Sequence, residues 1–250
     1  MDETDLQTYW DAFAPEYAAI QAESQLPLAS RVEQVLKKRH LLPTATVLDL
    51  GTGAGRFLPV LAANAQQVVA LDISQEMLKF ARQAEQTHGF DNITFVQANW
   101  QTFISRVGKY DIIFASMFPD VTDAKEMEQL LQLAVNGVIF GHFIRRQSQL
   151  DTIISRSVTL QSPDDTFNDA VMQSRKNALA DLGQTYSVDH LIFKTFEPVD
   201  RHLLLMDLKD QVINAEVPEL LEAVARLYHK KQTLKDEICY VYELLMVTPS

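Results

Sequence analysis

Short hydrophobic runs alternate with helical patterns over residues 44–143 of this 250-residue chain. Runs of this kind, separated by helices of about ten residues or more, imply crossover connections and a parallel sheet. Their nearly continuous hydrophobicity fits a sheet that is covered on both faces. We therefore predict a doubly wound α/β fold with strands at 46–50, 67–72, 93–96, 111–115 and 137–143, and helices over 55–64, 74–84 and 123–134.

The flanking segments are less regular. Residues 6–39 indicate helices, because Tyr9, Phe13, Tyr17 and Ile20 recur at helical spacing. Two late strands would extend the far edge of the sheet rather than build a second domain, while the pattern of 197–216 is ambiguous. No linker marks a boundary, so we expect one domain over residues 1–250, with a mostly parallel, seven-stranded, Rossmann-like sheet. The later elements are expected at 166–182 (helix), 188–196 (strand), 217–231 (helix) and 238–247 (strand).

Composition limits the classes of partner. The formal net charge is −11, which would repel a polyanion, so nucleic acid is disfavoured. The acidic start is unlike a secretory signal, and no apolar run is long enough to span a membrane, so we expect a cytoplasmic protein that does not bind membranes. The six histidines are scattered, and the single cysteine, Cys239, can form neither an internal disulfide nor a thiolate cluster, so no metal is expected.

A glycine-rich turn follows the first predicted strand. Gly51, Gly53 and Gly55 lie within five residues, at the carboxyl end of a strand, where open parallel sheets bind ligands. A bare tight turn or a pyrophosphate loop could also contain such glycines. However, the spacing is G-x-G-x-G preceded by Asp49, not the dinucleotide pattern G-x-G-x-x-G. Asp72 ends the next strand, where its carboxylate can accept hydrogen bonds from both hydroxyls of a ribose.

Four segments in order resemble motifs of class I S-adenosylmethionine-dependent methyltransferases. Val47–Arg56 resembles the first motif, Val69–Leu78 the second, Phe95–Trp100 the third and Tyr110–Ser116 the fourth. The opening segment Tyr9–Tyr17 resembles the aromatic N-terminal lid of small-molecule methyltransferases of this family. The resemblance implies a helical lid over 1–40, a cofactor-binding half over 44–145, and sheet completion with the substrate side over 146–250.

The same resemblance implies S-adenosylmethionine as cofactor and a role for each matching residue. The glycines would cradle the methionine portion, Asp49 would orient its ammonium group, and Asp72 would hold the ribose. The adenine would lie beside Ile73 and Met77, with its amino group near the amide oxygen of Asn99. The full implied set is Asp49, Gly51, Thr52, Gly53, Ala54, Gly55, Asp72, Ile73, Met77, Asn99, Trp100 and Ser116, with the backbone N–H of Trp100 at the ring edge and Ser116 near the sulfonium.

The methyl acceptor cannot be identified from these patterns. Methyl transfer from a sulfonium depends mainly on alignment and exclusion of water, so the sequence need not display a catalytic residue. His142 is the best candidate base, and Asp120 or Asp123 could orient an acceptor, although Asp123 could equally cap a helix. The tentative acceptor-side residues are Tyr9, Tyr17, Phe118 and His142.

A small molecule is the expected acceptor, because the chain is acidic and has a lid-like start. The segment Met117–Asp120 is only loosely similar to the Asn-Pro-Pro-Tyr motif of amino-methylating nucleic-acid enzymes. Two other interpretations stay open: an NAD-dependent oxidoreductase on the same fold, and a non-catalytic module that keeps the cofactor pocket. The oligomeric state is not readable from the sequence.

Overall fold

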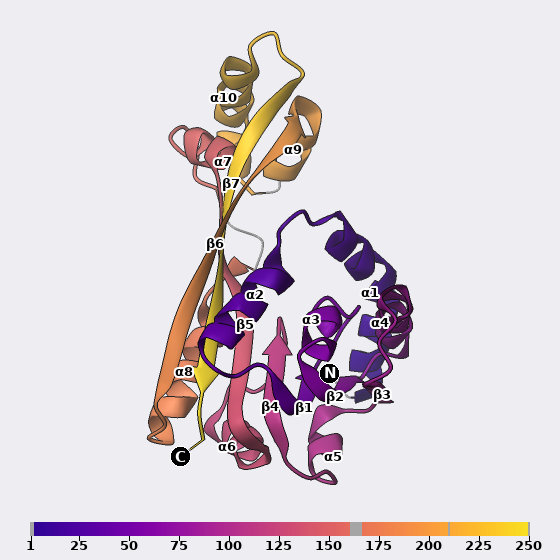
Figure 1. Cartoon of the computed structure of the whole chain (residues 1–250). Coiled ribbons are helices and arrows are strands. Elements are labelled where there is room, and N and C mark those ends of the chain that lie inside the picture. Colours follow the sequence, from indigo (N-terminus) through magenta and orange to yellow (C-terminus); the bar gives the residue numbers. More distant parts are fainter. Residues whose placement is uncertain (1–2, 161–166, 210, 250) are drawn as a thin grey trace. The chain divides into compact units, whose positions relative to one another are not determined.

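The computed structural model describes residues 3–160, 167–209 and 211–249. Seven strands form one sheet in the order β3-β2-β1-β4-β5-β7-β6 (Figure 1). Neighbouring strands among the first five pair in parallel, and β7 is antiparallel. The prediction of a mostly parallel, seven-stranded Rossmann-like sheet is therefore confirmed. The strands are β1 (Thr44–Leu50), β2 (Ala65–Asp72), β3 (Ile93–Gln97), β4 (Tyr110–Ser116), β5 (Ala134–Ser148), β6 (Tyr186–Asp200) and β7 (Thr233–Val247).

Helices connect these strands and cover both faces of the sheet. The crossovers from β1 through α3 and α4 to β3 run one way along the sheet, and the crossover from β4 through α6 to β5 runs the other way. Right-handed connections in opposite directions place their helices on opposite faces. The helices are α1 (Glu3–Glu23), α2 (Leu28–Lys38), α3 (Leu58–Ala62), α4 (Gln75–His88), α5 (Trp100–Ile104), α6 (Ala124–Leu133), α7 (Gln149–Ile154), α8 (Ala170–Asp181), α9 (Arg201–Lys209) and α10 (Val217–Tyr228), with a 3-10 turn η2 at Asn214–Glu216.

The central strand β1 is covered on both sides. Val47, Leu48 and Leu50 are fully buried, which explains the continuous hydrophobic run in the sequence. At the amino end of the strand, the Asp111 carboxylate of β4 accepts hydrogen bonds from the backbone N–H of Thr46 (2.7 Å) and from its hydroxyl (3.1 Å). Asp111, part of the fourth motif, thus joins two central strands at the end opposite the glycine turn.

Several element boundaries differ from the sequence prediction. The helix expected at 55–64 begins only at Leu58, because turns occupy most of the preceding segment. The short helices α5 and α7 were not predicted, and α9 lies in the segment that was ambiguous. The helix expected over 166–182 begins at Ala170; its first expected residue lies outside the described residues. Short helices are hard to recognise because they contain too few turns to show a period.

The chain divides into two compact units. Unit 1 contains Met1–His142, Ala170–Leu191 and Glu243–Ser250, and unit 2 contains Phe143–Asp169 and Ile192–Tyr242. The two late strands extend the sheet as expected, and each contributes residues to both units. The assignment of residues 1–250 to a single methyltransferase domain stays a prediction.

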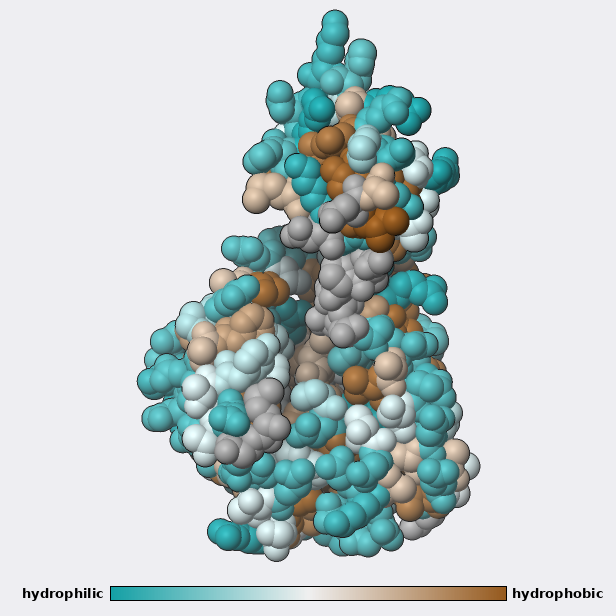
Figure 2. Space-filling view, turned by 180° about the vertical axis from the view of Figure 1, so that it is seen from behind, coloured by the Kyte–Doolittle hydropathy of each residue, from teal (hydrophilic) through white to brown (hydrophobic). Residues whose placement is uncertain are grey.

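Unit 2 has its own hydrophobic core, formed by side chains of α7, α9 and α10 with neighbouring residues. Its surface also carries apolar side chains: Leu203 and Met206 on α9 are more than half exposed, and brown atoms mark apolar residues on this unit in Figure 2. None of the helices in the described part of the chain is long and apolar enough to cross a membrane. The core residues are Leu150, Ile154, Val158, Leu204, Leu208, Val212, Leu220, Val224 and Tyr228.

Candidate active site

A cavity lies at the carboxyl ends of β1, β2 and β4, within unit 1. Helix α1 contributes Leu6, Trp10 and Tyr17, and the end of β4 with the loop after it contributes residues 116–120. The cavity brings together many of the residues predicted from the sequence, namely Tyr17, Gly51, Gly53, Asp72, Ile73, Met77, Asn99, Trp100, Ser116 and Phe118.

Two glycines of the turn are covered closely by aromatic rings. A Cβ atom on Gly51 would lie 2.5 Å from Cδ2 of Phe118, and one on Gly53 would lie 3.1 Å from Cε1 of Tyr17. Any larger residue would therefore collide with or displace a ring, so glycine allows the backbone to form the floor of the cavity. Gly55 differs, because a Cβ there would lie 3.0 Å from Cα of Ala81. It allows α4 to pack closely against the turn and does not line the cavity.

The carboxylate of Asp72 connects the glycine turn to the beginning of α4. It accepts hydrogen bonds from the backbone N–H groups of Gly53 (2.8 Å) and Ser74 (2.9 Å). A carboxylate has about four acceptor positions, so two such bonds leave capacity for further donors. Burial raises the pKa of Asp72 to about 6. A ligand that donates hydrogen bonds or brings a positive charge would stabilise the ionised form.

Asp49 lies behind the turn, with only 3% of its surface exposed. The hydroxyl of Thr52 donates a 2.6 Å hydrogen bond to Oδ2 of Asp49, and burial raises the pKa of this carboxyl to about 7. Neither residue is among those that line the cavity, and the buried Ala54 is not among them either. The orientation of an ammonium group by Asp49, directly or through water, stays a prediction.

The amide oxygen of Asn99 caps α5. It accepts hydrogen bonds from the backbone N–H groups of Gln101 (2.9 Å) and Thr102 (3.4 Å). Asparagine is a preferred N-cap residue, so this role was readable in principle from the sequence. The sequence-based prediction gave the same oxygen to the adenine amino group. That role stays a prediction, and the oxygen would have to share its two lone pairs with the cap.

The side chain of Trp100 contacts the loop after β4. Its indole Nε1 donates a 2.9 Å hydrogen bond to Oδ2 of Asp120, and its ring packs edge-on against Phe118, with centroids 6.2 Å apart. Asp120, which the sequence analysis offered as an acceptor-orienting residue, lines the cavity, and so does Met117, which it did not single out as a site residue. The loop therefore contributes a carboxylate as well as apolar surface.

Arg175 of α8 binds the backbone of this loop. Its side chain is fully buried and donates hydrogen bonds to the backbone carbonyls of Phe118, Asp120 (2.9 Å) and Val121 (3.3 Å). Its guanidinium also lies 4.4 Å from the centroid of the Phe140 ring. Sequence reasoning missed this residue, because an isolated arginine in a helical pattern carries no local signal of burial.

The remaining candidates lie away from the cavity. Tyr9 is 53% exposed and packs on its neighbours Trp10 and Phe13. His142 is buried, is not among the lining residues, and its Nδ1 finds no hydrogen-bond partner among the described residues. Burial and the charge of Arg175 lower the pKa of His142 to about 4, so the ring is neutral at pH 7. Asp123 caps α6, accepting a 2.9 Å hydrogen bond from the N–H of Glu126.

The electrostatic character of the cavity is acidic. Its lining, as far as the structure describes it, contains the carboxylates of Asp72 and Asp120 but neither lysine nor arginine. The pyrophosphate of a dinucleotide would be repelled in these surroundings, whereas a ligand with cationic groups would be attracted. Among the described residues, no three histidine, cysteine, aspartate or glutamate side chains gather as a metal site would require.

Comparison with known proteins identifies a matching family and several relatives. Residues 42–238 match a family model described as a methyltransferase domain. The chain is 31% identical over 106 residues to a protein-L-isoaspartate O-methyltransferase of Picosynechococcus sp., an alignment that covers 42% of this chain and 46% of the relative. It is 33% identical over 97 residues to a release factor glutamine methyltransferase of Francisella tularensis, covering 38% of this chain and 33% of the relative. The chain thus spans less than half the length of these relatives.

A solved structure supports the fold. The magnesium protoporphyrin IX methyltransferase from Synechocystis PCC 6803 with bound SAH superposes with a TM-score of 0.56 over the full length of both chains, at 17% identity. Together with the family match, these findings favour the methyltransferase interpretation over an NAD-dependent oxidoreductase. The chain belongs to the class I S-adenosylmethionine-dependent methyltransferases.

Proposed function

We propose that this methyltransferase transfers the methyl group of S-adenosylmethionine to a small-molecule acceptor bound in the cavity above the glycine turn. The observation that carries the proposal is the covering of this turn by aromatic side chains, with α1 forming one wall. Such a wall leaves a confined, largely apolar space. The net charge of −11 also argues against a nucleic-acid acceptor.

The residues that line the cavity fit the cofactor in charge and in chemical character. S-adenosylmethionine would supply a methyl group on a positively charged sulfonium sulfur. The carboxylate of Asp72 has free acceptor capacity for the ribose hydroxyls, and Ile73 and Met77 provide apolar surface for the adenine. The backbone at Gly51 and Gly53 would receive the methionine portion, which requires the rings of Phe118 and Tyr17 to shift from the glycines they cover.

The residues of this chain would contribute mainly alignment and exclusion of water. Trp10, Trp100 and Phe118 would hold an apolar or aromatic acceptor, and the carboxylate of Asp120 would orient a hydrogen-bond donor on it. His142 would not act as the base, because it is buried outside the cavity lining. Acceptors that are acidic when bound near the sulfonium would be disfavoured by the carboxylates.

The test is calorimetric binding of S-adenosylmethionine and S-adenosylhomocysteine, with NADH as a control and Asp72→Ala as the binding-deficient variant. Binding of the first two ligands, lost in the variant, is the expected result. Turnover would then be measured over matched acceptors: neutral and cationic aromatic small molecules, a peptide, and an oligonucleotide. Turnover confined to the peptide or the oligonucleotide would contradict a small-molecule acceptor.

A further inference from the structure

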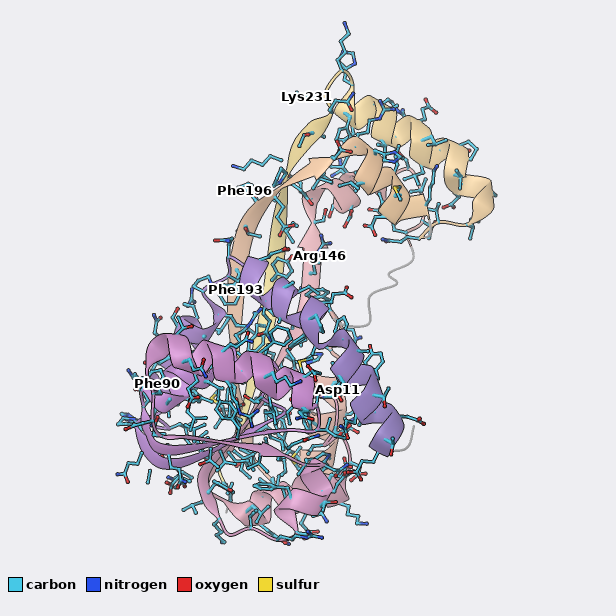
Figure 3. The ribbon with its side chains drawn as sticks, turned by 90° about the vertical axis from the view of Figure 1, so that its right-hand side faces the viewer. Asp11, Phe90, Arg146, Phe193, Phe196 and Lys231 are labelled. Atoms are coloured by element: carbon cyan, nitrogen blue, oxygen red, sulfur yellow. The ribbon has the colours of Figure 1, made fainter. Side chains whose placement is uncertain are left out.

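One carboxylate of α1 reaches the beginning of α4. Oδ1 of Asp11 accepts hydrogen bonds from the hydroxyl of Ser74 (2.6 Å) and from the backbone N–H of Glu76 (3.1 Å). Figure 3 shows Asp11 beside the end of α4 that lies opposite Phe90. Burial acts to raise the pKa of Asp11, but the hydrogen bonds from Ser74 and Glu76 lower it below its ordinary value. The group is therefore a carboxylate placed at the positive end of a helix.

The turn that Asp11 contacts also carries Asp72. The fully buried Ser74 donates its backbone N–H to Oδ1 of Asp72 (2.9 Å), while its hydroxyl accepts the N–H of Met77 and so caps α4. One serine thus joins three groups: the acid proposed to bind the ribose, the first turn of α4, and Asp11 on α1. A displacement of Asp11 would therefore move Ser74 and, through the Ser74 backbone N–H, the carboxylate of Asp72.

The helix that carries Asp11 also forms a wall of the cavity. Leu6, Trp10 and Tyr17 of α1 line it, and the Tyr17 ring covers Gly53. Asp11 makes a charged hydrogen-bonded contact between this helix and α4, and such bonds are stronger than those between neutral groups. The position of the wall and the orientation of Asp72 therefore depend on the same side chain.

We infer that Asp11 is a positioning residue for the cofactor: it holds α1 over the cavity and, through Ser74, fixes the ribose-binding carboxylate. The inference rests on the proposed role of Asp72. It predicts that loss of Asp11 strongly raises the dissociation rate of bound S-adenosylhomocysteine. The melting temperature of the ligand-free protein should fall only slightly.

Unit 2 contains a matched arrangement that serves as a control. Asp236 accepts hydrogen bonds from the hydroxyl of Ser148 (2.6 Å) and from the N–H of Leu150 (3.0 Å), and Ser148 caps α7. Asp236 thus accepts hydrogen bonds from the N-cap serine and from the second backbone N–H of α7, as Asp11 does at α4. Asp236 does not line the cavity. Replacing it removes the same local chemistry without touching the proposed site.

The experiment uses the full chain and S-adenosylhomocysteine as probe. Trp10 and Trp100 are the two tryptophans of the sequence, and both line the cavity, so intrinsic fluorescence reports on ligand there. Association and dissociation rates would be measured by stopped flow for the wild type, Asp11→Ala, Asp11→Asn and Asp236→Ala. Thermal unfolding would be recorded for each protein without ligand.

For Asp11→Ala we expect a dissociation rate raised by about tenfold or more, as for the loss of a charged hydrogen-bonded contact. Asp11→Asn keeps an acceptor oxygen without the charge and should show a smaller increase. Asp236→Ala should lower the melting temperature but leave the dissociation rate within about twofold of the wild type. Equal dissociation rates in Asp11→Ala and Asp236→Ala would overturn the inference. Absence of binding to the folded wild type would instead defeat the proposed function.

Discussion

The guanidinium of Arg175 donates a hydrogen bond to the backbone carbonyl of Asp120, with Nη2 2.9 Å from the oxygen. This bond connects α8 to a loop that begins almost 60 positions earlier in the sequence and forms part of the wall of the cavity. Met117 and Val121, near the two ends of the loop, both have positive φ angles, at 54° and 62°. Non-glycine residues hold this conformation only when their surroundings impose it, and Arg175 is a large part of those surroundings.

Replacing Arg175 by methionine should therefore loosen the loop. Each buried carbonyl left without its donor costs about 1–3 kcal/mol, so we expect a clear fall in melting temperature together with weaker binding of S-adenosylhomocysteine. Leu179→Ala is the matched control, because Leu179 is fully buried on the same helix and contributes only apolar packing. If both variants lose the same stability and both keep wild-type affinity, Arg175 has no role in shaping the cavity.

Cofactor affinity should fall in mildly acidic solution. The pKa values of Asp72 and Asp49 are raised to about 6 and about 7 by burial, and both proposed roles require the ionised carboxylate. Below each pKa the protonated form predominates, so affinity should drop by up to about tenfold per pH unit for each group. Calorimetry between pH 8 and pH 5 in buffers of different ionisation enthalpy should also reveal proton release on binding. An affinity that is constant over this range would contradict the proposed roles.

The stability of the ligand-free protein should depend on pH in the opposite sense. A carboxyl whose folded-state pKa lies above the unfolded value binds more protons in the folded state, so the fold gains stability as pH falls from 8 through about 7 and 6. Asp72→Asn should remove the part of this gain that is centred near pH 6. Urea unfolding at several pH values, with each variant in its ligand-free form, measures the slope.

Gly55 should be intolerant of alanine for two reasons that can be separated. Its φ angle is +85°, and an added Cβ would lie 3.0 Å from the Cα of Ala81. Gly89 has a similar φ of +70° but no neighbour within 4 Å of an added Cβ. Gly89→Ala should therefore cost about 1 kcal/mol of unfolding free energy from the backbone alone, and Gly55→Ala about 1–3 kcal/mol more from overpacking. Equal losses by urea titration would show that α4 moves away freely.

A change in the core of unit 2 should affect stability without affecting cofactor binding. The fully buried Tyr228 donates its hydroxyl to the carbonyl of Val199 at 3.0 Å. Tyr228→Phe should destabilise the chain by about 1 kcal/mol. Its affinity for S-adenosylhomocysteine should equal that of the wild type, because the cavity belongs to unit 1. A weaker affinity at a temperature where the variant is folded would show that this core influences the site.

The sequence determined the sheet, the parallel direction of its first five strands, and the glycine turn that lines the cavity. These features depend on local patterns: hydrophobic runs of strand length, helical spacing between them, and glycines with acids at fixed distances along the chain. Asp72, Gly51 and Gly53 could be selected because strand ends in a parallel sheet converge at one edge. Trp100 and Ser116, which the family resemblance implied, also line the cavity.

Only the tertiary structure decided which side chains line the cavity and which are buried away from it. Arg175 and Asp11 act through partners more than 50 positions away, and no local pattern encodes contacts of that range. His142 and Asp49 looked exposed to a ligand at their strand ends, but packing buries both outside the cavity lining. The compact unit around α7, α9 and α10 was also not predicted, because its core is assembled from short segments that are far apart in the sequence. Burial is a property of the assembled chain, so the positions of these side chains could not be predicted from local sequence patterns.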